Sequence, residues 1–296
     1  MTPPVTIVIS SPTSTTASPS DPGALRIGRP GETEIDVMDL GLTRGDGIFE
    51  TVGISHGRVH AVDEHLRRFA RSAGILDLPE PNAALFRAAV ELGIRELQPG
   101  DREAYCKYVL TRGIEGTDQP TGWAYLDFNP DWTTQRTEGI AVVLLSRGYP
   151  LDVQTASPWL LQGAKTLSYA VNRSVLREAA RRGADDVVFT TTDGHLLEGP
   201  TSSLVMKFGN TVVTPAMEGG VLHGTTQIDT FAFFEGLGFE TVYRAVEVGE
   251  LADADAAWMT NSQRLAAAIT SVDGVARAAD FELSARLNAF LVGRTS

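Results

Sequence analysis

The segment 164–204 constrains the fold more than any other part of the chain. It opens on Lys165, and the stretch from Leu167 to Arg182 predicts a helix. Gly183 is suited to end that helix, because glycine accepts the left-handed conformation that follows many helices. Two extended runs then meet over Asp193-Gly194, a dipeptide that favours a tight hairpin turn. A helix followed directly by a hairpin indicates that helices and strands share one domain.

The other segments repeat this mixture of helices and strands. Residues 47–60 read as extended, with a turn at His56-Gly57, and residues 61–75 have the apolar spacing of a helix, for which Asp63 is a suitable N-cap. Further helices are expected at 81–97, 225–235, 247–252 and 280–292, further strands at 4–9, 104–113, 123–129, 139–148 and 256–260, and a second hairpin over Gly209-Asn210.

The pattern predicts an α/β (α+β) protein of two domains, because 296 residues are many for one hydrophobic core. Residues 10–33 are rich in Ser, Thr, Pro and Gly, which is typical of a flexible arm. The predicted division is a strand and flexible arm at 1–33, a small N-terminal α/β domain at 34–147, a linker at 148–160 and a larger C-terminal domain at 161–296.

Charge and cysteine content exclude several classes of protein. A net charge of −12 argues against binding to nucleic acid or to an anionic membrane, so an anionic substrate would need a local group of basic residues. The single cysteine, Cys106, excludes an intramolecular disulfide and a multi-cysteine metal site, and we identify no metal ligands. No apolar run is long enough for a bilayer, and the first residues lack the features of a signal peptide, so we expect a cytoplasmic protein.

Lys165 is the strongest candidate for chemistry. The chain has only three lysines against 22 arginines, so arginine supplies almost all of the other basic charge. Only an amine can form a Schiff base with a carbonyl group, such as the aldehyde of pyridoxal phosphate (PLP). An exposed, solubilising lysine is the ordinary alternative, but the segments around it favour a nucleophile.

Two segments nearer the N-terminus contribute candidate groups. The glycines at 45 and 47 in RGDGIFET allow the backbone to approach a neighbour or a ligand closely, or else mark a plain turn before a strand. In EHLRRF, His65 and Arg68 lie three residues apart and share a helix face. The guanidinium of Arg68 could bind a phosphate, and a solvated basic face is the simpler alternative.

Three later segments add an acid and several hydroxyls. Glu198 follows an apolar hairpin strand, where it could pair with a pyridinium nitrogen or be an ordinary surface acid. Thr225 and Thr226 lie in GTTQ at a helix start, where amides and hydroxyls could bind a phosphate or simply cap the helix. Thr260 follows a strand and could add another hydroxyl.

These segments, in this order, resemble the class IV aminotransferase family, the fold-type IV PLP enzymes. The similarity covers roughly residues 34–292, and five separated motifs match in sequence order: RGDGIFET, EHLRRF, KTLSY, LLEGPTSSL and GTTQ. The resemblance implies a two-domain fold with PLP at the domain interface. It also implies a homodimer in which a loop of one subunit closes the site of the other.

The resemblance assigns roles to the candidate residues. Lys165 corresponds to the lysine that forms the Schiff base with PLP, and Glu198 to the acid that contacts the pyridine nitrogen. Arg68 corresponds to the arginine that binds the PLP phosphate, with Thr225 and Thr226 in the phosphate loop.

Two positions depart from the family pattern. Ser203 stands where the family usually has Asn, and Gln227 stands where it usually has Arg. These differences bear on the subfamily rather than on the cofactor. Tyr169 is expected near the phenolic oxygen of PLP, and Ser203 and Thr260 are retained as further cofactor contacts.

Three activities of the family compete: 4-amino-4-deoxychorismate lyase, which serves folate biosynthesis, D-amino acid transaminase and branched-chain transaminase. Phe49 in GDGIFET and Asn261 in ADAAWMTNS lie in stretches that resemble the lyases, and both are predicted substrate contacts. Arg112 is expected to meet a substrate carboxylate. We therefore expect a lyase that eliminates pyruvate to give 4-aminobenzoate.

Transamination of D-amino or branched-chain amino acids is the alternative, because its early steps are shared. In both reactions the amine of Lys165 would act as a base at the carbon that bears the substrate amine. A non-catalytic PLP-binding protein is an alternative of a different class. The presence of both Lys165 and Glu198 argues against it, because a carrier needs neither a base nor stabilisation of a carbanion.

Overall fold

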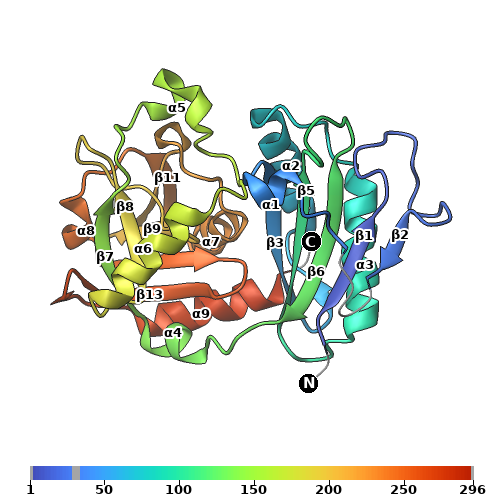
Figure 1. The fold of residues 1–296 in the computed structure, drawn as a ribbon. Helices are drawn as coiled ribbons and strands as arrows, with labels where there is room; N and C mark the ends of the chain where they lie inside the picture. Colours follow the sequence, from blue (N-terminus) through green and yellow to red (C-terminus); the bar gives the residue numbers. More distant parts are fainter. Residues whose placement is uncertain (1–2, 29–33, 295–296) are drawn as a thin grey trace. The chain divides into compact units, whose positions relative to one another are not determined.

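The computed structural model describes residues 3–28 and 34–294 (Figure 1). The chain divides into two compact units. Unit 1 contains the described residues up to Pro130 together with Ala164–Tyr169, and unit 2 contains Asp131–Gly163 and Ala170–Arg294. The predicted two-domain α/β class is confirmed. The boundaries differ from those predicted, because the chain changes unit after Pro130 and Lys165 belongs to unit 1.

Among the described residues, unit 1 forms an antiparallel sheet in the order β2-β1-β6-β5-β3-β4. Helices α2 and α3 pack against one face, where the centre of the Phe69 ring lies 4.9 Å from that of Phe86 and 5.0 Å from that of Tyr108. The elements are β1 (Val5–Ile9), β2 (Leu25–Ile27), α1 (Leu40–Thr43), β3 (Gly47–Ser55), β4 (Arg58–Val59), α2 (Val62–Ile75), α3 (Ala83–Leu97), β5 (Ala104–Thr111) and β6 (Thr121–Phe128).

Helix α2 spans the predicted residues to within one position, but its N-cap is not the predicted one. Its N-cap is Ala61, which has a left-handed backbone with φ of 48° and offers no side-chain cap. The predicted cap, Asp63, lies in the first turn instead, where its carboxylate forms an ion pair with Arg87 on α3. An acid in the first turn still interacts favourably with the positive end of the helix, so the residue is suited to its place although its predicted role is wrong.

The described part of the predicted arm is bonded to unit 1. Strand β2 pairs with β1, and Asn82 Nδ2 donates hydrogen bonds to the carbonyls of Ser14 and Ala17 at 2.8 and 3.0 Å. The same Asn82 caps α3, because its Oδ1 accepts from the backbone amide of Leu85. Residues 29–33 of the predicted arm lie outside the described residues.

Among the described residues, unit 2 forms a mixed sheet in the order β11-β10-β9-β12-β13-β7-β8, with β14 paired to β13. Strand β7 runs parallel to both β8 and β13, which places it in this sheet and not in unit 1. The strands are β7 (Ile140–Ser146), β8 (Asp186–Thr190), β9 (Ser203–Phe208), β10 (Thr211–Pro215), β11 (Glu240–Arg244), β12 (Ala256–Asn261), β13 (Leu265–Val272) and β14 (Val275–Ala276).

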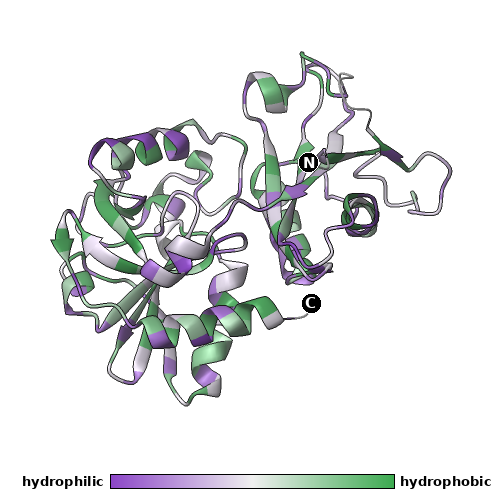
Figure 2. Cartoon of the chain, turned by 90° about the horizontal axis from the view of Figure 1, so that it is seen from below, coloured by the Kyte–Doolittle hydropathy of each residue, from purple (hydrophilic) through white to green (hydrophobic). Residues whose placement is uncertain are grey.

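The helices of unit 2 bury a second core. Trp258 of β12 is fully buried, and its Nε1 atom donates to Ser284 Oγ of α9 at 2.7 Å. Strand β12 is buried except for its last residue, and hydrophobic stretches like it appear green among the strands and helices in Figure 2. None of the helices that the structure describes has the length and apolar character needed to cross a bilayer. The helices are α4 (Thr133–Glu138), α5 (Val153–Ala156), η1 (Pro158–Leu160), α6 (Ala170–Arg181), η2 (Met217–Gly219), α7 (Thr225–Gly236), α8 (Glu250–Asp253) and α9 (Phe281–Gly293).

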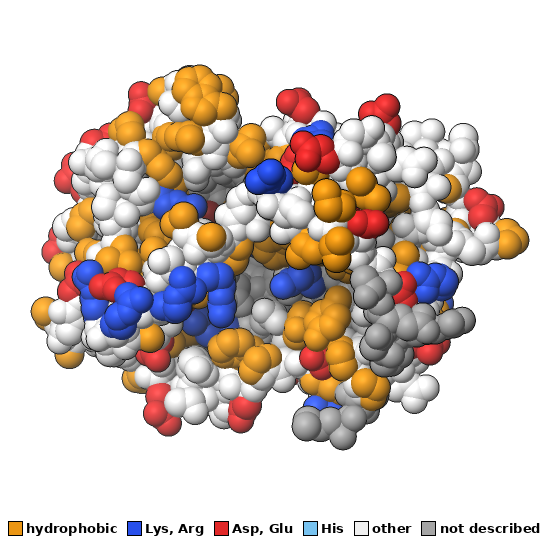
Figure 3. All heavy atoms as spheres, viewed as in Figure 1, with side chains coloured by type: hydrophobic (Ala, Val, Ile, Leu, Met, Phe, Trp, Pro, Cys, Tyr) orange, Lys and Arg blue, Asp and Glu red, His pale blue; other side chains and the backbone are white. Residues whose placement is uncertain are grey.

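Basic side chains gather over α6 of this acidic protein (Figure 3). Arg173 and Arg177 are exposed one turn apart, and Arg181 and Arg182 both form ion pairs with Glu178. Exposed pairs of this kind contribute little to stability. We interpret this group as a solvated helix face.

The segment Ala164–Tyr169 docks on β3. The amide of Phe49 donates to the carbonyl of Lys165 at 3.0 Å, and the amide of Leu167 donates to the carbonyl of Gly47 at 2.8 Å. The amide of Lys165 itself donates to Ser72 Oγ of α2 at 3.1 Å. These backbone bonds fix the position of the lysine relative to β3 and α2.

Gly47→Ala should weaken this docking. A Cβ atom at Gly47 would lie 2.8 Å from both the carbonyl oxygen of Leu110 and Cδ1 of Leu167, closer than real Cβ contacts. We expect a loss of about 1–3 kcal/mol in the free energy of unfolding and faster hydrogen exchange at the amides of Phe49 and Leu167. The matched control is Gly74→Ala in α2, because nothing lies within 4 Å of a Cβ there. Equal effects of the two substitutions would contradict the close packing at Gly47.

Candidate active site

Lys165 lies beside two aromatic rings of unit 1. Its Nζ atom is 4.6 Å from the centre of the Phe49 ring, and that ring meets Tyr169 edge-on with centres 5.4 Å apart and an interplanar angle of 82°. The sequence assigned all three residues to the active site, and the structure brings them together. An ammonium over an aromatic face is attracted to it, so Phe49 helps to hold the amine in place.

Sequence reasoning did not single out Lys107, the second lysine near this ring. Its Nζ atom is 5.5 Å from the centre of the Phe49 ring. The register of β3 and β5 pairs Phe49 with Val109 and Thr51 with Lys107, so Phe49 and Lys107 lie on the same face of the sheet. The alternation of strand residues was visible in the sequence, but the pairing of these two strands was not.

Arg68 lies in a buried cluster of charged residues below this face. Its Nε and Nη2 atoms each donate to a different oxygen of Glu50 at 2.7 Å, and His65 Nδ1 lies 2.7 Å from Glu50 Oε2. Glu50 and His65 are fully buried and Arg68 is 8% exposed. The predicted shared face of His65 and Arg68 is present, but it faces the sheet and not the solvent.

Glu50 carries the charge that makes this cluster stable. Burial by itself would raise the pKa of Glu50, but the charge and hydrogen bonds of Arg68, and then those of His65, hold it well below its usual value. The bidentate pair of hydrogen bonds to the two carboxylate oxygens of Glu50 also fixes the plane of the Arg68 guanidinium. The sequence reasoning missed Glu50, although an acid at an inward position of a strand signals a buried basic partner.

Arg112, the predicted contact of a substrate carboxylate, is bonded to other groups of unit 1. Its Nε and Nη2 atoms donate to the carboxylate of Asp46 at 2.7 and 3.2 Å, and Nη2 also donates to the carbonyl of Leu76 at 2.7 Å. The bond to Asp46 is the main reason that the pKa of Arg112 is raised. Arg112 therefore joins the turn before β3 to the end of α2, and a substrate carboxylate would compete with Asp46.

In unit 2, a backbone amide orients Glu198. The Oε1 atom of Glu198 accepts a hydrogen bond from the amide of Leu222 at 2.8 Å, and Glu198 is partly exposed. A carboxylate held in this way can present its charge to a ring nitrogen. Leu222 lies two residues before Gly224, so the same short loop positions Glu198 and leads into α7.

The first turn of α7 has the features of an anion site. Gly224 is its N-cap without a side-chain cap, no acidic residue lies in the first turn, and Thr225 and Thr226 are buried. A Cβ atom at Gly224 would lie 2.3 Å from Ser203 Oγ, so the loop passes directly over Ser203. Thr260 pairs with Ser203 between β12 and β9. The four predicted residues of unit 2 that carry hydroxyls therefore gather around the start of α7.

Asn261, a predicted substrate contact, is used as a turn cap. Its Oδ1 atom accepts from the amides of Gln263 and Arg264 at 3.0 and 2.7 Å, and its Nδ2 atom donates to Ser202 Oγ at 3.0 Å. Arg264 in turn donates to Ser202 and to buried Asp186. The amide of Asn261 is thus largely committed to holding the turn after β12.

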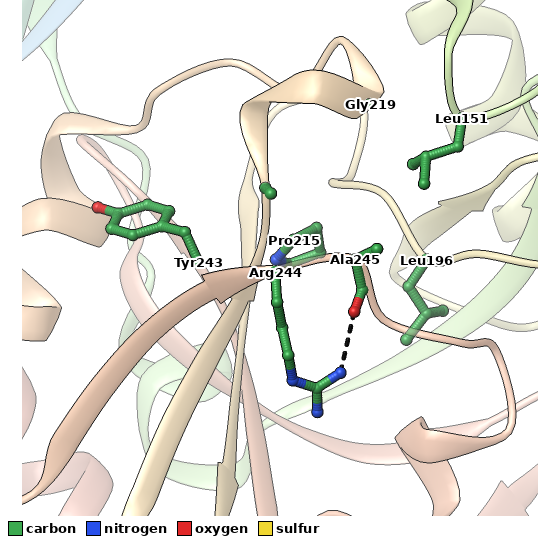
Figure 4. A pocket seen from close by; sticks show the side chains of 8 residues that line it. Leu151, Leu196, Pro215, Gly219, Tyr243, Arg244 and Ala245 are labelled. Atoms are coloured by element: carbon green, nitrogen blue, oxygen red, sulfur yellow. Dashed lines mark hydrogen bonds between the residues drawn. The ribbon is translucent and has the colours of Figure 1, made fainter.

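A cavity of about 310 Å³ lies elsewhere in unit 2 (Figure 4). Its wall includes Leu151, Leu196 and Pro215, and its charged residue, Arg244, donates to the carbonyl of Ala245 and to Glu250. None of the predicted cofactor residues lines this cavity. Its apolar wall and neutralised arginine do not fit a phosphorylated cofactor.

Glu50→Gln should destabilise unit 1, because Arg68 would keep a buried charge without a carboxylate. Removing one partner of a buried pair costs about 3–5 kcal/mol, which urea unfolding at neutral pH would measure. Glu64→Gln is the control, since its partner Arg67 is exposed and such pairs are worth about 0–1 kcal/mol.

The stability that Glu50 contributes should depend on pH. Because the fold lowers the pKa of Glu50, its contribution is fully present above the unfolded pKa near 4.5 and becomes smaller as the pH falls below that value. The difference between wild type and Glu50→Gln should therefore shrink in acid, and a growing difference would contradict the assignment.

Gly224→Ala should disturb the loop over Ser203, because the added methyl group would overlap Ser203 Oγ. We expect a loss of about 1–3 kcal/mol in unfolding free energy. Removing the obstructing side chain in the double variant Gly224→Ala, Ser203→Gly should recover most of that loss. A double variant that is less stable than Gly224→Ala would show that the contact is not the cause.

Known proteins resemble the chain over most of its length. The family model of class IV amino-transferases matches residues 47–272. A bifunctional aminodeoxychorismate lyase / D-amino acid transaminase of Mycobacterium tuberculosis is 40% identical over 255 residues, which cover 83% of this chain and 88% of that protein.

Two solved structures share the fold over nearly the whole chain. A fold IV-transaminase from Curtobacterium pusillum has a TM-score of 0.94 and 46% identity, with coverage of 99% of this chain and 100% of the other. The PLP-bound form of a hypothetical aminotransferase from Mycobacterium tuberculosis has a TM-score of 0.87 and 35% identity, with coverage of 97% and 99%. The chain therefore belongs to the class IV aminotransferases and is a PLP-dependent enzyme.

Proposed function

We propose that the protein is a 4-amino-4-deoxychorismate lyase, which releases pyruvate and 4-aminobenzoate, and that the same site also transaminates D-amino acids. The observation that carries this proposal is the 40% identity, over 83% of the chain, to a relative that is named for both activities. The placement of Lys165 against Phe49 supports it, because both reactions need an amine base at one defined position.

The described residues fit PLP. The start of α7, with buried hydroxyls and no acid in its first turn, suits a phosphate dianion. Glu198, held by the amide of Leu222, suits a protonated ring nitrogen. We propose that Thr225 and Thr226 bind the phosphate, and that Arg68 joins them while Glu50 continues to hold its Nε and Nη2 atoms.

The remaining predicted contacts complete the proposal. Tyr169, next to Phe49, would lie near the phenolic oxygen, and Ser203 and Thr260 would add hydroxyls near the phosphate loop. A substrate carboxylate would meet positive charge at Lys107, and at Arg112 only in competition with Asp46. We also expect a cytoplasmic homodimer, as the family resemblance implies.

Each residue has a separate task in the reaction. When bound, PLP supplies an electron sink for the charge that develops at the reacting carbon. The Lys165 amine takes the proton from the carbon that bears the substrate amine, and Glu198 holds the ring proton that this sink requires. Phe49, which packs against Tyr169, places an aromatic ring beside the Lys165 amine. For transamination Lys165 would return its proton to the former aldehyde carbon of the cofactor. In the lyase reaction the C–O bond at the neighbouring substrate carbon would break instead, and pyruvate would leave as its enolate, which takes up a proton.

The central experiment compares Lys165→Ala with Lys207→Ala. Lys207 is the matched control, because its amine pairs with Asp255 in unit 2 and has no proposed role. We expect Lys165→Ala to lower turnover by about 10²–10⁴-fold, and to lose the borohydride-stable cofactor adduct on the peptide that contains residue 165. Lys207→Ala should keep both. An adduct on another residue would contradict the proposal.

The substrates distinguish the two activities. Incubation with aminodeoxychorismate alone should give pyruvate and 4-aminobenzoate without an added keto acid, and D-alanine with 2-oxoglutarate should give keto-acid-dependent amine transfer. L-leucine with 2-oxoglutarate tests the branched-chain alternative. Cofactor bound to Lys165 without product from any of these would overturn the enzymatic assignment in favour of a carrier.

A further inference from the structure

The C-terminal end of the described chain contacts the first turn of α7. Arg294 follows α9, and its guanidinium donates to Asp229 Oδ2 at 2.7 Å and to Thr226 Oγ1 at a longer 3.4 Å. Only 5% of the Arg294 side chain is exposed, and its Nε atom is buried with no partner among the described residues. A buried cation thus lies at the helix end to which the proposed function assigns a phosphate.

Gln227, the next residue of this turn, also has a donor that the fold does not use. Its Oε1 atom accepts from the hydroxyl of Tyr243 at 3.1 Å, whereas its Nε2 atom is buried without a partner in the described part of the chain. Gln227 is 2% exposed. Unmatched donors that are buried at the positive end of a helix favour a bound anion.

The contact with Arg294 sets the direction of the Thr226 hydroxyl. A guanidinium can only donate, so Thr226 Oγ1 must accept from it, and the hydroxyl proton of Thr226 is directed to another acceptor. Arginine keeps its charge even where burial lowers its pKa, and the carboxylate of Asp229 offsets part of that charge. The remaining positive potential lies on the Thr226 side.

We propose that Arg294 is a positioning residue for the cofactor phosphate, which it serves by orienting the Thr226 hydroxyl and by adding positive charge at the start of α7. The amide of Gln227 supplies a further donor. This inference rests on the proposed function, since the anion is the phosphate of PLP. It accounts for Gln227 at a position where the resembling family has Arg, because the guanidinium arrives from the end of α9 instead.

The experiment measures the affinity of the full-length apo protein for PLP and for pyridoxal, which lacks the phosphate, by absorbance titration. The variants are Arg294→Gln, Arg294→Lys and Asp229→Asn. Arg294→Gln should weaken PLP binding about tenfold, the worth of one charge-assisted hydrogen bond, and should change pyridoxal binding less than about twofold. Arg294→Lys should restore part of the loss, because it restores the charge.

Two controls separate this role from a structural one. Arg277→Gln removes another largely buried guanidinium of unit 2, which donates to the carbonyl of Ala254 and not to α7, so it should leave the ratio of PLP to pyridoxal affinity unchanged. Asp229→Asn removes the ion pair but keeps the cation, and should leave PLP binding equal or tighter. Thermal unfolding of each apo variant reports any general loss of stability.

The outcomes distinguish this inference from the proposed function. If Arg294→Gln weakens PLP and pyridoxal equally, or if Asp229→Asn weakens PLP as much as Arg294→Gln does, Arg294 only holds α9 to α7 and the inference is wrong. If wild type binds PLP at Lys165 but Arg294→Gln leaves the affinity unchanged, the inference fails and the function stands. If wild type forms no PLP adduct at Lys165, the proposed function itself fails.

Discussion

Two backbone hydrogen bonds, between β3 and the segment that carries Lys165, are the interaction on which the proposed role of Lys165 depends. They join the carbonyls of Lys165 and Gly47 to amides of the opposite segment. A lysine side chain has four rotatable bonds, so it can be positioned only if its backbone is fixed first. The missing side chain at Gly47 permits this approach, and the Phe49 ring then restricts the amine itself.

The protein is acidic overall, yet it holds buried arginines at the positions to which the proposed function assigns an anion. Each of them has a carboxylate partner: Glu50 for Arg68, and Asp229 for Arg294. A buried guanidinium without a partner would be costly, and one that is fully neutralised would attract no phosphate. The carboxylates therefore have a double effect, because they make burial possible and they orient the remaining donors. At Arg112, whose side chain is 36% exposed, Asp46 and a carbonyl satisfy the cation and favour a structural role instead.

The sequence predicted correctly those turns that depend only on a few neighbouring residues. The turns at His56-Gly57, Asp193-Gly194 and Gly209-Asn210 are present, because glycine at positive φ suffices to form them. Strand β13 escaped detection, since its alanine-rich sequence resembles no typical strand and pairing with β7 and β12 decides its conformation. The wrong N-cap at Asp63 has a similar cause, because its partner Arg87 lies on the next helix.

The candidate site shows the same division. Lys165 and Glu198 could be proposed from the sequence, because the chemistry of an amine and of a carboxylate is specific. Their partners were not readable, since Glu50 lies 18 residues from Arg68, and Thr226 lies 68 residues from Arg294. Contacts at such separations depend on strand order and helix packing, which no short motif records.

The path of the chain around Lys165 has a consequence for how the protein can be divided. Unit 2 is interrupted between Gly163 and Ala170, and the intervening six residues belong to unit 1. A fragment that ends at Pro130 would lack the segment Ala164–Tyr169, and would expose the amide of Phe49 and the carbonyl of Gly47. A chimaera of two relatives that are joined at a single point after Pro130 would therefore combine the segment Ala164–Tyr169 of one protein with the β3 of the other. A stable chimaera would need to take this segment and β3 from the same protein.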